Sequence, residues 1–215
     1  MPLPMIHLST AVKIKTLHGL KSPEFYLGSI SPDAVHMRTG FVREDKTRSH
    51  CNARVLEAIE ELDSMCVMIE KSVGKEKDFL LGYLVHILTD LFWENTIYKT
   101  YNERYEADPA PIQDKRMAYY NDTDQLDFAF YEKEIWRPKV WEMLTEAQDF
   151  AVEDAVNKEE VAAWKHRTLT WYNSGKSQHT KPIKYIAYED LDSFTSYAAG
   201  KCEEYLQSKG FVQFE

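Results

Sequence analysis

The sequence predicts an all-α protein, a single-domain bundle of helices over residues 1–215. Apolar residues recur with the three- and four-residue spacing of a helix nearly throughout the chain. No stretch alternates convincingly between apolar and polar residues. Glycine and proline number only 8 each, which disfavours a β-sandwich with its many turns.

The predicted helices follow one another along the chain. Ser31 before Pro32 is typical of a helix start, with Ser31 as the N-cap. Apolar residues fall on one face of a helix over 53–72, and the same pattern over 191–205 ends before Gly210. The remaining predicted helices span 4–17, 78–101, 123–136, 139–155 and 159–173.

Charge and cysteine content narrow the classes of function. The 26 basic and 35 acidic residues give a net charge of −9, which disfavours an extended nucleic-acid-binding surface. Three cysteines without close spacing fit a reducing compartment better than a disulfide framework. No signal peptide is evident and no apolar run approaches the ~18 residues of a membrane span. We therefore expect a cytoplasmic protein without a transmembrane segment.

The strongest functional signal is a polar pair in the most apolar segment. Residues 79–93 are apolar nearly all round, as in a helix at the centre of a core, yet they include His86 and Asp90. Four residues apart, these side chains share one helix face and can reach one metal ion. The alternative is a hydrogen bond between them or to a buried arginine. Because an unpaired buried carboxylate is costly, the apolar surroundings favour a metal.

Three earlier residues are further candidates. His7 points inward from the first helix, although a single inward histidine is more often a core residue than a ligand. Asp33 lies in the first turn of its predicted helix, where the helix dipole alone would explain an acid. It can also bind a metal or take a proton from a metal-bound water. His36 can be a ligand, a partner of a ligand or a surface residue, and its role stays open.

A basic stretch over 38–50 stands out in this acidic protein. The usual interpretation of such a charged stretch is a solvated loop, and we favour it here. Beside a metal site, its Arg38 and Arg43 could instead hold a phosphate through charge-assisted hydrogen bonds.

His50 presents a geometric difficulty. In a simple antiparallel hairpin of helices 53–72 and 78–101, His50 would lie roughly 18 Å beyond the level of His86. It can join the site only if segment 47–52 folds back or the helices are strongly tilted.

The order of these residues resembles the zinc-dependent phospholipase C family, whose wider superfamily includes zinc-dependent single-strand nucleases. The motifs that carry the resemblance are His7, Tyr-Leu-Gly-Ser-Ile-Ser-Pro-Asp33, His50 ahead of a helix, and His86-x-x-x-Asp90. The resemblance covers about the first 100 residues. The segment from Lys181 onward is also similar to the closing helix of small bacterial members.

The resemblance implies an all-α fold with a metal cluster between helices. The residues that it places around one zinc ion are Asp33, His50, His86 and Asp90. It implies that Asp90 bridges to a second metal held by His7, that Asp33 doubles as the general base, and that His50 reaches the metal. Secreted members bind a further metal through later His and Glu residues. This sequence has no histidine between His86 and His166, so we expect one or two metal ions.

The leading hypothesis is a metal-dependent hydrolase of a small phosphorylated or phosphodiester substrate. Zinc is the expected metal, although manganese, iron or nickel also accept histidine and carboxylate ligands. One rival is a helical phosphohydrolase marked by an adjacent His-Asp pair, a dipeptide that this sequence lacks. The other rival is a non-catalytic helical protein whose degenerate metal site braces the core.

Overall fold

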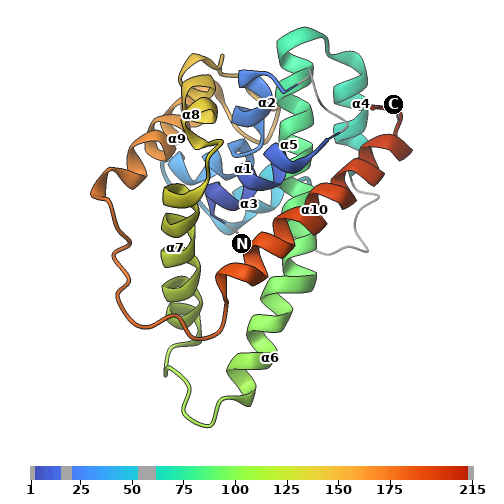
Figure 1. Ribbon diagram of the computed structural model, residues 1–215. Coiled ribbons are helices and arrows are strands. Elements are labelled where there is room, and N and C mark those ends of the chain that lie inside the picture. Colours follow the sequence, from blue (N-terminus) through green and yellow to red (C-terminus); the bar gives the residue numbers. More distant parts are fainter. Residues whose placement is uncertain (1–2, 16–20, 53–61, 213–215) are drawn as a thin grey trace.

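The computed structural model describes residues 3–15, 21–52 and 62–212 (Figure 1). These residues are helical or irregular, and their one β feature is an isolated antiparallel bridge between Val152 and Val156. The prediction of an all-α fold is confirmed. No helix of the described ranges is long and apolar enough to span a membrane.

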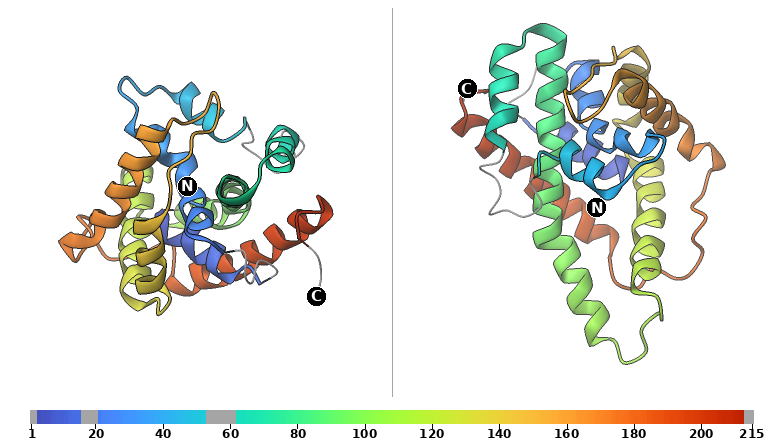
Figure 2. Two further views of the ribbon diagram at one scale, coloured as in Figure 1. Left: turned by 90° about the horizontal axis from the view of Figure 1, so that it is seen from above. Right: turned by 180° about the vertical axis from the view of Figure 1, so that it is seen from behind.

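The helices form a bundle in which segments distant in sequence lie side by side (Figures 1 and 2). Their bounds, in chain order, are α1 (Pro4–Lys13), α2 (Pro23–Gly28), the 3-10 helix η1 (Ser31–Met37), α3 (Arg43–Ser49), α4 (Asp63–Lys71), α5 (Gly74–Trp93), the π-helix η3 (Glu94–Tyr98), α6 (Lys99–Ala107), α7 (Lys115–Lys133), α8 (Arg137–Glu146), α9 (Lys158–Trp171), the 3-10 turn η4 (Tyr172–Ser174) and α10 (Tyr188–Ser208).

Helix α5 lies at the centre of the bundle. Helices α1, α2, α4, α10 and η1 all pack against it. Every residue from Phe79 to Thr89 is buried, as the apolar composition of this segment predicts. The helix begins at Gly74, whose φ of 55° favours glycine, and it runs through the π-helix into α6. Its predicted end at residue 101 is therefore too early.

Two glycines allow α2 to approach α5 closely. A Cβ atom on Gly28 would lie 2.0 Å from the carbonyl oxygen of Phe79, and one on Gly82 would lie 2.0 Å from that of Phe25. Neither position can carry a side chain without moving the backbone. The crossing brings Ser29, which follows α2, against the middle of α5.

Other predicted boundaries also change. Helix α7 begins at Lys115, before the predicted 123, because the carboxylate of Asp114 caps it by accepting the N–H of Met117 at 3.0 Å. Helix α8 stops at Glu146, and the predicted helical segment up to 155 is irregular. Ser31 is not an N-cap.

Instead, Ser31 is the first residue of η1, and its hydroxyl donates to the carbonyl of Leu27 at 2.7 Å. The first helix ends at Lys13, before the predicted 17. The first part of the predicted helix over 53–72 lies outside the described residues.

Candidate metal centre

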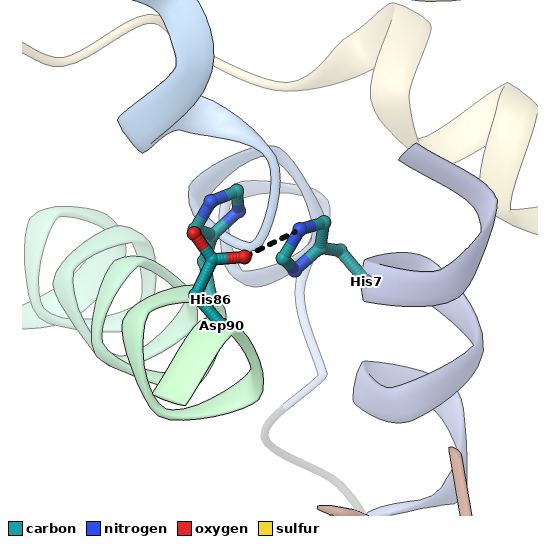
Figure 3. Close-up of side chains that lie close together, drawn as sticks. All are labelled: His7, His86 and Asp90. Carbon is teal, nitrogen blue, oxygen red and sulfur yellow. Dashed lines mark ion pairs between the residues drawn. The ribbon is translucent and has the colours of Figure 1, made fainter. Parts of the chain in front are cut away.

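Five side chains from four parts of the chain meet inside the bundle. They form the metal cluster, defined as His7 of α1, Asp33 of η1, His50 after α3, and His86 and Asp90 of α5. His7 Nε2 lies 3.5 Å from Asp90 Oδ1, and His50 Nε2 lies 3.2 Å from Asp90 Oδ2. His50 Nε2 and His86 Nε2 lie 3.7 and 4.0 Å from the Asp33 carboxylate. Figure 3 shows His7 facing His86 and Asp90 across the gap between α1 and α5.

The cluster contains two groups with the spacing of metal ligands. His7, His86 and Asp90 form one group, and Asp33, His50 and His86 form the other. In each group the candidate ligand atoms lie within 4.8 Å of one another. Among the described residues, these two groups alone have that spacing, and both contain His86. The arrangement can hold one or two ions.

Backbone carbonyls orient two of the imidazoles. Nδ1 of His86 lies 2.9 Å from the carbonyl oxygen of Ser29, and Nδ1 of His50 lies 3.0 Å from that of Lys46. Because a carbonyl oxygen can only accept, Nδ1 carries the proton in both rings. Nε2 then presents its lone pair to the cluster, which is the orientation that a metal ligand needs.

The cluster leaves several buried polar atoms without a hydrogen-bond partner. Both ring nitrogens of His7, Nε2 of His50 and of His86, and Oδ1 of Asp90 are all unpartnered. In the tautomers given above, Nε2 of His50 and of His86 carries no proton to donate, so their short distances to the carboxylates are not hydrogen bonds. Unpartnered buried atoms are rare in folded proteins because each costs desolvation energy. Imidazole nitrogens and carboxylate oxygens are ligands of zinc, so the donor set fits this metal.

The electrostatics of the cluster also fit a cation. Burial lowers the pKa of His7 well below its usual value and lowers the pKa of His86, so both rings are neutral at neutral pH. Burial opposes ionisation of Asp33, but Lys46 and the neighbouring histidines outweigh it and hold the pKa of Asp33 well below its usual range. The pKa of Asp90 is also low, because contacts with His50 and His86 outweigh burial. The cluster therefore combines the neutral imidazoles of His7 and His86 with two carboxylates.

The hairpin geometry that placed His50 far from the site is wrong. His50 is the C-cap of a separate short helix, α3, and directly follows its last residue, Ser49. The hydroxyl of Tyr83 donates to the carbonyl of Ser49 at 2.6 Å, which ties the end of α3 to α5 one turn before His86. Cys51 has a left-handed φ of 53° and turns the chain away directly after His50.

Helix α1, which carries His7, is anchored by Asp127 of α7. Oδ1 of Asp127 accepts the N–H of Met5 at 3.0 Å, in the first turn of α1, and Oδ2 accepts the hydroxyl of Tyr172. Burial raises the pKa of Asp127 to about 7. Sequence reasoning missed this residue, because nothing local distinguishes it from the other acids of α7.

The two arginines predicted to bind phosphate occupy different environments. The guanidinium of Arg38 donates to both carboxylate oxygens of Glu160 at 2.7 and 3.0 Å, to Asp45 at 2.8 Å and to the carbonyl of Ala155 at 2.8 Å. This network joins η1, α3 and α9. Arg43 is exposed at the start of α3. Phosphate binding by either arginine stays a prediction.

Lys46, which the sequence analysis did not single out, brings a cation into contact with the cluster. Its Nζ lies 3.2 Å from Asp33 Oδ1. The stretch containing Lys46 was expected to be a loop by default. If this stretch is treated as a helix, Lys46 and His50 lie four residues apart and share one face. That spacing is the signal in the sequence that could have identified Lys46.

His36 lies at the edge of the cluster. Its Nε2 is 3.8 Å from Asp33 Oδ1, and its side chain is partly exposed. The contact makes His36 a neighbour of the candidate ligand Asp33. The two groups of ligand spacing do not include His36.

Comparison with known proteins identifies the family. The sequence model of a family described as zinc dependent phospholipase C matches residues 3–209. The chain belongs to this family. The match includes the segment 102–180, for which the sequence analysis found no resemblance. No curated protein and no solved structure matches the chain significantly.

Proposed function

We propose that this member of the zinc-dependent phospholipase C family is a hydrolase of phosphoric esters, with the metal cluster as its active site. The observation that carries the proposal is the convergence of five ligand-type side chains with unpartnered buried nitrogens and oxygens. The family membership supports a hydrolase that uses zinc. The proposed substrate is a small phosphorylated or phosphodiester compound.

The proposed roles follow from the two ligand groups. Asp33, His50 and His86 would hold one ion, and His7 with Asp90 would hold a second. A bound divalent ion would supply Lewis-acid chemistry, lowering the pKa of a water molecule and polarising a phosphoryl oxygen. The low pKa of Asp33 makes it a strong anionic ligand and a weak proton acceptor. We therefore propose that Asp33 acts as a ligand that also orients the attacking water.

The rest of the chain would keep the cluster preorganised. The carbonyls of Ser29 and Lys46 fix the two imidazoles that they contact. His7 and His86 are each at most 1% exposed, so bulk water does not reach these two rings. Fixed ligands need no reorganisation when the substrate arrives.

The test is elemental analysis of protein purified without a histidine tag, followed by hydrolysis of bis-p-nitrophenyl phosphate. We expect bound zinc in the wild type, and loss of both zinc and activity in His86→Ala. His166→Ala is the matched control, because His166 is exposed on α9 and belongs to neither ligand group. Absence of any bound transition metal, and no rise in Tm on adding zinc or manganese, would contradict the proposal. Bound zinc without activity on any ester would favour a structural metal that braces the core.

A further inference from the structure

The outer side of the metal cluster is bordered by hydrogen-bond donors. We define the donor rim as Lys46 of α3 with Trp164 and Arg167 of α9. Lys46 reaches Asp33 directly, with 3.2 Å between Nζ and Oδ1, and its side chain is 23% exposed. It can therefore contact both the cluster and a molecule arriving from solvent.

The α9 part of the donor rim lies over η1, the element that carries Asp33. Helix α9 and η1 pack against each other. His36 of η1 connects the two, because its ring centroid is 6.2 Å from that of Trp164 and its Nε2 is 3.8 Å from Asp33 Oδ1. Arg167 follows Trp164 by three residues and so lies on the same side of α9.

Arg167 is a cation whose contacts are aromatic. Its guanidinium carbon lies 4.7 Å from the ring centroid of Trp164 and 4.2 Å from that of Trp171. Among the described residues, no carboxylate lies within ion-pair distance of Arg167. Burial lowers the pKa of Arg167, while the charge of Asp33 is among those that raise it. Its stacking on Trp164, whose ring lies near that of His36, places Arg167 on the side of α9 that packs against η1.

Trp164 adds a third donor. The residue is 6% exposed, and its indole N–H is buried without a hydrogen-bond partner. Trp, Arg and Lys side chains can only donate hydrogen bonds. The donor rim therefore requires an acceptor-rich ligand, and its two charges favour an anion.

The two tryptophan rings of α9 near the rim already have a cation on one face. A quaternary ammonium is recognised by open aromatic faces. Here the guanidinium of Arg167 already covers Trp164 and Trp171. A positively charged head group would also meet Lys46 and Arg167 with like charge.

We infer that the site takes a phosphoric ester with a net charge of two or more negative units, whose additional negative charge is held by Lys46 and Arg167. A zwitterionic choline ester is disfavoured. The inference rests on the proposed function and specifies its class of substrate.

The test compares three substrates that release the same p-nitrophenolate from zinc-loaded enzyme. They are p-nitrophenyl phosphate, a dianion; bis-p-nitrophenyl phosphate, a monoanion; and p-nitrophenyl phosphocholine, a zwitterion. We expect Lys46→Met and Arg167→Met each to lower kcat/KM for the dianion by about ten- to hundredfold, the value of a charged hydrogen bond. The zwitterion should lose less than about threefold, because it makes no such contact. Lys46→Arg and Arg167→Lys should recover part of the loss.

The charge-matched control is Lys139→Met, since Lys139 is exposed on α8 and pairs with Glu142. We expect it to leave all three rates unchanged. Equal losses for all three esters in the rim variants, or a wild-type preference for the choline ester, would overturn the inference.

Calorimetric titration of zinc-loaded protein with inorganic phosphate provides a readout without turnover. We expect weaker phosphate binding in Lys46→Met and Arg167→Met than in the wild type or Lys139→Met. If no ester is hydrolysed but phosphate binding depends on the rim, the proposed function fails and the anion site stands. If esters are hydrolysed but phosphate binds equally to all variants, the anion site fails and the hydrolase stands.

Discussion

The imidazole rings of His7 and His86 stack face to face, with centroids 3.7 Å apart and planes 6° apart. One ring comes from the first helix and the other from the centre of α5. Two protonated rings at this distance would repel each other, and burial further disfavours their charged forms. The pair is therefore neutral at neutral pH, which is the form that binds a metal ion.

This stacking predicts acid sensitivity of the metal-free protein. The pKa values of His7 and His86 lie below the value of 6.5 that applies in the unfolded chain. The unfolded state therefore takes up more protons as the pH falls, so stability is complete above pH 6.5 and declines below it. Urea unfolding across this range should show the decline in the wild type and a smaller decline in His7→Gln. An undiminished slope in that variant, with the same slope in the control His166→Ala, would contradict the prediction.

Asp127 should have the opposite effect on stability, which it lowers as the pH rises. Its pKa is about 7 in the folded protein and 3.8 in the unfolded chain, so its favourable contribution is complete below pH 3.8 and is lost as the pH rises through 7. The full difference corresponds to about 4 kcal/mol. Asp127→Asn should remove this dependence, so the variant gains stability relative to the wild type as the pH rises. Glu103→Gln, an exposed change on α6, is the control and should leave the profile unaltered.

The close crossing of α2 and α5 predicts a sharp difference between two glycines. Gly82→Ala places a Cβ atom against the backbone of Phe25 and should cost at least about 1–3 kcal/mol, a fall in Tm of several degrees. It should also weaken zinc binding, because Ser29 orients His86. The matched control is Gly200→Ala in α10, where a Cβ meets nothing within 4 Å. That change should be neutral or stabilising by up to about 1 kcal/mol.

Substitutions of Arg38 and Arg43 should differ in their effect on thermal stability. Arg38→Met breaks the contacts to Asp45 and Glu160, so we expect Tm to fall by several degrees with KM little changed in the protein that remains folded. Arg43→Met should leave Tm unchanged, because Arg43 is exposed. A raised KM in either variant, with Tm preserved, would instead support the role in phosphate binding predicted from the sequence.

The sequence predicted the helical fold and singled out the five residues that the structure brings together as a candidate metal cluster. The fold and the His86–Asp90 pair follow from local chemistry, since a helical period is a property of neighbouring residues and this pair in an apolar segment is costly without a cation. The motif order around Asp33 added the remaining members through the family resemblance.

Only the tertiary structure decided which charges surround that cluster. His50 reaches it because Tyr83 holds the end of α3, and Lys46 faces Asp33 from the same helix. Arg38 is instead committed to Glu160, a partner 122 residues away. Spacing along the chain cannot determine such pairings, because they depend on how helices distant in sequence cross. The crossing of α2 and α5 in turn depends on two glycines whose role appears only when both helices are in place.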